Sequence, residues 1–229
     1  TVLKNPESFI GIGTVPMQDV NLAIREMERC MKDLKMPGIE IATNVNGRNL
    51  GESEFFPFYE AAEKFGCALF IHPWDMMGEK QMPEFWLPWL VGMPAETTRA
   101  MCSLIFSGVF EKFPRLRIAF AHGGGSFAYT LGRIEHGYHV RPDLVQINNK
   151  RNPREYLGRF WVDSLVHDEN AFQFLRSVVG DSSICVGSDY PFPLGEKNPG
   201  SLIEQLNLNT ETRNKFMYQN AMNWLGKLI

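Results

Sequence analysis

The sequence has little cysteine, no long apolar run and no marked excess of charge of either sign. Cys30, Cys67, Cys102 and Cys185 are widely separated and form no Cys-x-x-Cys pair. This spacing excludes a dense disulfide scaffold and favours the reducing cytoplasm. No apolar run approaches the roughly 18 residues of a membrane-spanning helix. The 23 basic and 26 acidic side chains give a formal net charge of -3. Such a charge provides no basic field for nucleic acid or anionic lipid, so we expect a small-molecule partner.

The chain does contain an alternation of strand-like and helical segments along its whole length. This alternation is typical of βαβ units and a parallel sheet, and no linker or compositional break divides it. With 229 residues and 44% hydrophobic content, the chain is long enough for one sizeable core. We therefore predict an α/β fold with a single domain over residues 1–229. The predicted strands, all rich in apolar residues, are 9–15, 38–44, 67–73, 117–123, 160–166 and 183–189.

Five further segments have the apolar spacing and end signals of helices, and they are 19–36, 53–66, 94–113, 168–180 and 209–226. In the first, apolar side chains recur at three- and four-residue spacing with charged residues between them. The second has Pro57 near its first turn and Gly66 after its last. The longest irregular stretch, 74–93, is too long for a plain connection and is typical of a functional loop.

Three of the predicted strands end on a side chain that can bind a metal or transfer a proton. These residues are His72, His122 and Asp189. Taken singly, each has an ordinary structural interpretation, as a strand-end residue, a turn residue before glycines or a turn cap. In a (β/α)8 barrel, however, the C-terminal ends of all strands converge on one face. The repeated placement of these residues therefore predicts a site at that face.

The residue types favour a catalytic zinc site. Imidazole and carboxylate suit Zn²⁺, and a catalytic zinc keeps one position open for water. The bound water titrates near neutrality, and a second histidine beside the metal can take its proton. His122 has room for that role because residues 123–125 are all glycine. One histidine and one aspartate are too few for a stable zinc site, so this set is incomplete.

Seven short motifs form a specific combination: "HPWDM", "WLPWLVGMPAETT", "GVFEKFP", "FAHGGG", "GRIEHG", "RPDL" and "GSDYPFPLGE". On these motifs the chain resembles the aminocarboxymuconate semialdehyde decarboxylases of the amidohydrolase superfamily over essentially its whole length. The resemblance implies a distorted TIM (β/α)8 barrel with one divalent metal, usually zinc. It also implies loss of CO₂ from 2-amino-3-carboxymuconate 6-semialdehyde, giving 2-aminomuconate 6-semialdehyde. That reaction belongs to the kynurenine pathway of tryptophan catabolism and limits quinolinate and NAD formation.

The resemblance also implies roles for particular residues. His72 and Asp189 match the metal-binding histidine and aspartate, and His122 matches the catalytic histidine that activates bound water. Arg133 matches an arginine that reaches into the partner subunit's site and holds a substrate carboxylate, so a homodimer is implied. As an alternative, Arg133 is an ordinary exposed helix residue.

Three further residues are expected at the substrate pocket. Trp86 matches a tryptophan of the family's pocket, and Met76 and Phe192 are expected to line it too. Plain core packing is the alternative for each of them.

The chain departs from the family pattern at its N-terminal side. The family's first strand carries a His-x-His pair that completes the metal site, and a substrate-binding arginine follows it. Neither occurs here, since none of the five histidines forms a His-x-His pair. Six strands are predicted where a closed barrel needs eight. We expect a fragment whose first strands are missing, and a natural short isoform is the alternative.

Two other functions fit the sequence. One is a different metal-dependent decarboxylase or hydrolase of the same superfamily, acting on an aromatic acid. The other is an inactive subunit for dimerisation or regulation, which the missing His-x-His pair allows.

Overall fold

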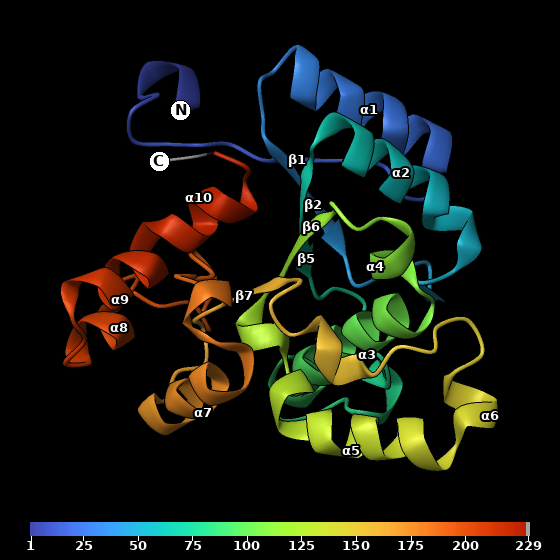
Figure 1. Ribbon diagram of the computed structural model, residues 1–229. Helices are drawn as coiled ribbons and strands as arrows, with labels where there is room; N and C mark the ends of the chain where they lie inside the picture. The colour runs from blue at the N-terminus through green and yellow to red at the C-terminus, as the bar shows by residue number, and fades with distance from the viewer. Residues whose placement is uncertain (228–229) are drawn as a thin grey trace.

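The computed structural model of the protein describes residues 1–227 and contains a six-stranded parallel sheet (Figure 1). The strands lie side by side in chain order, and each neighbouring pair is parallel. Their C-terminal ends therefore meet at one edge, where loops bring distant residues together. The strands are β1 (Gly13–Thr14), β2 (Gly38–Ala42), β5 (Ala68–His72), β6 (Arg117–Phe120), β7 (Trp161–Asp163) and β8 (Ile184–Cys185).

Strand β5 shows how the sheet separates its two faces. Leu69 and Ile71 are fully buried and belong to the main hydrophobic core. Ala68 and Phe70 belong to a second, smaller apolar cluster. Because successive side chains of a strand point to opposite faces, His72 lies on the same face as Ala68 and Phe70. The last residue of the strand thus points away from the main core.

The helices follow local signals in the sequence. Helix α1 begins after Asp19, whose carboxylate accepts hydrogen bonds from the backbone N–H groups of Asn21 and Leu22. Helix α2 ends at Gly66, which adopts the left-handed conformation at φ 66°. The helices are α1 (Val20–Lys32), α2 (Phe56–Phe65), α3 (Met93–Phe106), α4 (Val109–Lys112), α5 (Phe127–Val140), α6 (Pro142–Val145), α7 (Glu169–Val179), α8 (Ser201–Gln205), α9 (Thr210–Asn214) and α10 (Asn220–Trp224).

Helix α10 lies on the opposite side of the strands from α1 and α2 (Figure 1). Its Trp224 packs in the smaller apolar cluster with Ala68 and Ala119. Arg117 holds the end of this helix, since its Nε donates to the Trp224 carbonyl at 2.7 Å and its Nη2 to the Gly66 carbonyl at 2.6 Å. Helix α10 is therefore attached to the face of the sheet that carries the smaller apolar cluster.

The structure confirms all six predicted strands, although each is shorter than predicted. The predicted helix 94–113 is divided at Gly108, whose φ of 80° ends α3 and starts α4. The predicted loop 74–93 contains a short helical turn, η3 (Glu79–Gln81), and a π-helical turn, η4 (Pro88–Gly92). A hairpin of β3 (Asn44–Val45) and β4 (Arg48–Asn49) was not predicted.

The predicted single domain over 1–229 stays a prediction, and its residues 228–229 lie outside the described part. Across residues 1–227, no helix combines the length and the apolar character needed to cross a membrane.

Candidate functional site

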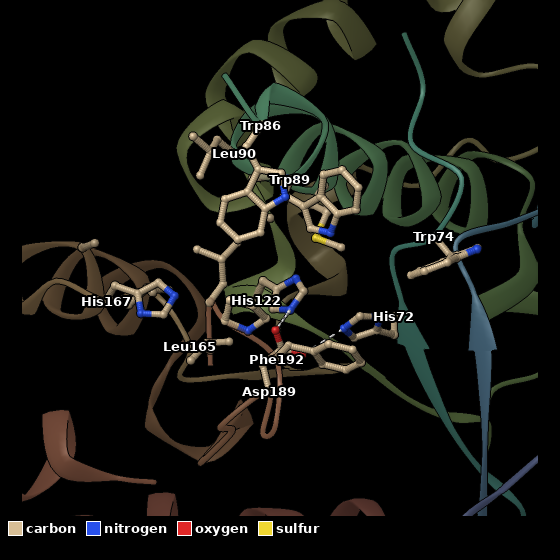
Figure 2. A pocket seen from close by; sticks show the side chains of 17 residues that line it. His72, Trp74, Trp86, Trp89, Leu90, His122, Leu165, His167, Asp189 and Phe192 are labelled. Atoms are coloured by element: carbon tan, nitrogen blue, oxygen red, sulfur yellow. Dashed lines mark hydrogen bonds and ion pairs between the residues drawn. The ribbon is translucent and has the colours of Figure 1, made fainter. Parts of the chain in front are cut away.

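Three side chains from separate strand ends meet at the C-terminal edge of the sheet. His72 Nε2 lies 3.3 Å from Asp189 Oδ1, and His122 Nε2 lies 3.8 Å from Asp189 Oδ2. The two imidazole rings are edge to face, with centroids 4.9 Å apart. Figure 2 shows both rings directed toward the carboxylate. Residues separated by as many as 117 positions in the chain thus form one cluster, as the sequence predicts.

Each residue is positioned in a different way. His72 is the last residue of β5. His122 and Asp189 do not end their strands, because β6 ends at Phe120 and β8 at Cys185. Both adopt positive φ, 57° for His122 and 51° for Asp189, which is uncommon for residues other than glycine. Sharp turns after the strands therefore aim these two side chains back at His72.

The glycines after His122 are required by close packing. A Cβ at Gly125 would lie 2.3 Å from the Pro94 carbonyl oxygen, and one at Gly123 would lie 2.6 Å from Val166. The Gly123 N–H donates to Asp163 Oδ1 at 2.9 Å, and that oxygen also accepts the Leu165 N–H at 3.0 Å. Asp163 therefore fixes the turn that carries His122.

Burial decides the protonation of His122. Desolvation lowers the pKa of this imidazole below its ordinary value, and the neighbouring His72 acts in the same direction. The carboxylates of Asp163 and Asp189 oppose the shift without cancelling it. His122 is therefore neutral near neutral pH, the form that accepts a proton.

The cluster has a donor set that suits a divalent cation. One ligand atom from each of His72, His122 and Asp189 lies within 4.8 Å of the other two. Two imidazole nitrogens and a carboxylate fit Zn²⁺ and related transition metals. All three side chains are largely buried, at 13 to 20% exposure, so a bound ion would be shielded from bulk water. The residues thus fit a metal site.

A cavity of about 520 Å³ opens onto the cluster and is walled mainly by aromatic and aliphatic side chains (Figure 2). Trp86 and Trp89 stack in its wall, with ring centroids 5.8 Å apart and an interplanar angle of 28°. A volume of this size is ordinary for a small-molecule site. The lining residues are His72, Trp74, Trp86, Trp89, Leu90, Met93, Pro94, His122, Gly125, Leu165, Val166, His167, Ala171, Asp189, Phe192, Pro193 and Leu194.

Of the residues predicted to bind substrate, Trp86 and Phe192 lie in the cavity wall. Met76 lies outside it: the side chain is buried, and a Cβ at Gly92 would come within 3.0 Å of its Cβ. The reason is a turn at Asp75, which adopts φ 53°. This turn leaves Trp74 in the cavity wall and directs Met76 into the packed interior. Arg133 is an exposed residue of α5 and lies outside the wall of its own chain's cavity.

Several residues of the site were not predicted from the sequence, among them Trp89, His167 and Asp163. Trp89 and His167 line the cavity, and Asp163 supports the His122 turn. Asp163 ends β7, so a correct strand boundary would have identified it as a carboxylate at the same sheet edge. His167 has φ 61°, a strained conformation that the sequence does not reveal.

The chain is similar to known proteins over almost its whole length. The model of a family described as "Amidohydrolase" matches residues 1–227. A Dictyostelium discoideum protein named 2-amino-3-carboxymuconate-6-semialdehyde decarboxylase is 54% identical over 226 residues, which cover 98% of this chain and 63% of the relative. A Caenorhabditis elegans protein of the same name is 33% identical over 97% of this chain and 68% of its own length. The chain thus spans about two thirds of the length of these relatives.

A solved structure has a fold similar to that of this chain. The 5-carboxyvanillate decarboxylase of Novosphingobium aromaticivorans, complexed with manganese and 4-hydroxy-3-methoxy-5-nitrobenzoic acid, superposes with a TM-score of 0.86 at 28% identity. The match covers 98% of this chain and 66% of that one. Together with the family match, it confirms the predicted α/β fold of the amidohydrolase barrel type.

Proposed function

The chain belongs to the amidohydrolase family, and from this premise we propose that it acts in a metal-dependent decarboxylation. The proposed reaction converts 2-amino-3-carboxymuconate 6-semialdehyde to 2-aminomuconate 6-semialdehyde without oxidation. The observation that carries the proposal is the convergence of His72, His122 and Asp189 at the floor of one cavity. The names of the Dictyostelium and Caenorhabditis relatives support the choice of substrate.

In this proposal His72 and Asp189 supply two of the ligands of one divalent cation, and zinc is the proposed metal. The donor set supports it, and a structural neighbour contains manganese at 28% identity. When bound, the cation supplies Lewis acidity and offsets negative charge on the substrate.

His122 is the proposed proton carrier. Decarboxylation breaks the bond between the substrate carbon and its carboxylate, releases CO₂ and leaves the bonding electron pair on that carbon, which then takes up a proton that comes from water. The lowered pKa of His122 keeps its imidazole neutral at rest, so it can take up a proton and deliver it to that carbon. The carboxylate of Asp189, 3.8 Å from Nε2, would stabilise the imidazolium formed on the way.

The cavity walls support a flat, conjugated substrate. Trp86 and Trp89 present stacked indoles, and Phe192 adds a further aromatic surface. Aromatic faces bind planar π-systems by stacking. The wall thus suits the planar, conjugated chain of a muconate better than the flexible chain of a saturated acid.

A homodimer is part of the proposal. The exposed Arg133 of one subunit would enter the partner's cavity and hold a substrate carboxylate. The proposed setting is the cytoplasm, where the reaction would divert an intermediate of tryptophan catabolism away from quinolinate and NAD formation.

Decarboxylation of an aromatic acid is a second candidate. It is favoured by the structural match to 5-carboxyvanillate decarboxylase and by the same aromatic walls, which would also stack on a benzoate. Turnover of a hydroxybenzoate, with none of the muconate semialdehyde, would select this candidate.

The test compares the purified wild-type protein with His122→Ala and with the control His139→Ala, an exposed histidine of α5. Loss of the substrate's near-ultraviolet absorbance reports turnover, and elemental analysis reports metal. We expect the same metal content in all three proteins and at least about a hundredfold loss of kcat in His122→Ala alone. Activity within a few-fold of wild type in His122→Ala would refute its assigned role. A wild-type protein without metal and without turnover would favour an inactive subunit.

A further inference from the structure

A fully buried carboxylate lies behind the cavity wall and outside the metal cluster. Glu96 of α3 is 0% exposed, and its charge is paired with Arg99 one turn later on the same helix. Burying a carboxylate is costly, and an apolar residue would often serve the core as well. The other hydrogen-bond partners of Glu96 indicate the role of this carboxylate.

Those partners belong to the segment that follows His72. Glu96 Oε2 accepts the Met77 N–H at 3.0 Å. Glu96 Oε1 accepts from the Asn44 side-chain amide at 3.0 Å. The same amide donates to the carbonyl oxygens of Trp74 at 3.0 Å and Asp75 at 3.2 Å. The Glu96–Asn44 pair therefore binds the backbone of 74–77 at three points.

That segment needs such support. Asp75 adopts φ 53°, a conformation that costs a non-glycine residue free energy unless its surroundings impose it. Trp74 and Asp75 are exposed, so packing alone does not hold them. Asn44 is itself fixed, because its Oδ1 accepts the Gly47 N–H at 3.0 Å within the β3–β4 hairpin.

We propose that Glu96 and Asn44 are positioning residues that set Trp74 in the cavity wall and so control substrate affinity. They act through the backbone of 74–77 and touch neither the metal cluster nor the reacting atoms. His72 is held independently by the sheet hydrogen bonds of β5. The predicted change in KM rests on the proposed function, whereas the predicted change in the backbone of 74–77 does not.

The test uses Glu96→Gln and Asn44→Ala, with Glu204→Gln as a matched control. Glu204 also forms an ion pair, with Arg213, but on the surface and far along the chain. In Glu96→Gln one carboxylate oxygen becomes an NH₂ group, which cannot accept a hydrogen bond, so a bond to the loop or to Asn44 is lost. Hydrogen exchange of the amides of 74–77, KM, kcat and Mn²⁺ affinity are measured for each folded variant.

We expect exchange at 74–77 to accelerate roughly tenfold in both variants. KM should rise by about three- to tenfold, with kcat and Mn²⁺ affinity within about twofold of wild type. Glu204→Gln should change none of these. A purely structural role for Glu96 would lower the unfolding midpoint and leave KM of the folded enzyme unchanged.

Unchanged exchange at 74–77 overturns the inference whether or not the protein turns over substrate. Faster exchange with unchanged KM overturns it too, because the loop would then not control affinity. A wild-type protein that decarboxylates neither candidate substrate refutes the proposed function, and in that case the exchange result alone decides the positioning role.

Discussion

Single residues in strained conformations carry the chemistry proposed for this site. His122 and Asp189 both have positive φ, and the three glycines after His122 also have positive φ, at 62°, 75° and 63°. A turn of this shape has no room for side chains, because Gly125 lies directly against the Pro94 carbonyl. The placement of His122 therefore depends on residues that contribute no functional group.

Replacing Gly125 by alanine should destabilise the protein and displace His122. The new Cβ would lie 2.3 Å from the Pro94 oxygen, and alanine is strained at φ 63°. We expect a loss of about 1–3 kcal/mol in the free energy of unfolding, measured by urea denaturation. Gly132→Ala is the control, since a Cβ there meets nothing within 4 Å in α5 and should stabilise by up to about 1 kcal/mol. Equal stability of the two variants would contradict this account.

The four thiols should be unreactive in the folded protein. Burial raises the pKa of Cys67 and of Cys102 to about 12 and also raises the pKa of Cys30 and Cys185. At pH 8 the thiolate fraction of a thiol with that pKa is on the order of 10⁻⁴. A chromogenic disulfide reagent should therefore label the native protein far more slowly than the guanidinium-unfolded one. Rapid labelling of Cys67 or Cys102 in the native protein would disagree with this burial.

At the residue scale, the sequence shows the type of a side chain but not its backbone conformation. His72, His122 and Asp189 could be identified because they follow apolar runs that resemble strands. His167 could not, because its place in the cavity follows from a φ of 61° in a loop. Glu96 was missed because a charged residue in a helix is normally on the surface.

At the scale of elements, the residues that mark helix ends predicted the boundaries better than the apolar pattern did. The segment 94–113 was predicted as one helix, yet Gly108 divides it into α3 and α4. The β3–β4 hairpin escaped prediction because its strands have two residues each, although Asn46 and Gly47 both adopt positive φ in its turn. By contrast, the predicted helix starts at residues 19 and 168 coincide with the N-caps of α1 and α7, Asp19 and Asp168.

The cap of α1 gives a direct test at this scale. Asp19→Ala removes the acceptor of two backbone N–H groups and should lower the free energy of unfolding by about 0.5–2 kcal/mol. The control is Asp33→Ala at the other end of the helix, where a carboxylate faces the negative end of the dipole and its removal should be neutral or slightly stabilising. Urea titrations of both variants provide the measurement, and a larger loss for Asp33→Ala would reverse the expected order.

For the whole molecule, the order of six parallel strands places the loops of the site at one edge of the sheet. The alternation of segments predicted this sheet, but the barrel type was implied by the resemblance rather than by periodicity. Arg133 belongs to this scale, because an exposed residue outside its own cavity would reach substrate only in a second chain.

Mixing of inactive variants tests that idea. Arg133→Ala and His122→Ala should each be inactive, whereas their heterodimer should contain one intact site. Random exchange at equal concentrations would restore roughly a quarter of wild-type activity, measured by substrate absorbance. If no activity returns while the subunits demonstrably exchange, an arginine acting across the interface is excluded.

The most direct test of the central claim is the position of the metal. Crystals of the protein grown with Zn²⁺ or Mn²⁺, and measured at the absorption edge of that metal, should show one anomalous peak between His72 and Asp189, about 2.0–2.2 Å from their ligand atoms. An anomalous map with no peak there, or with its peak elsewhere on the chain, would contradict the account.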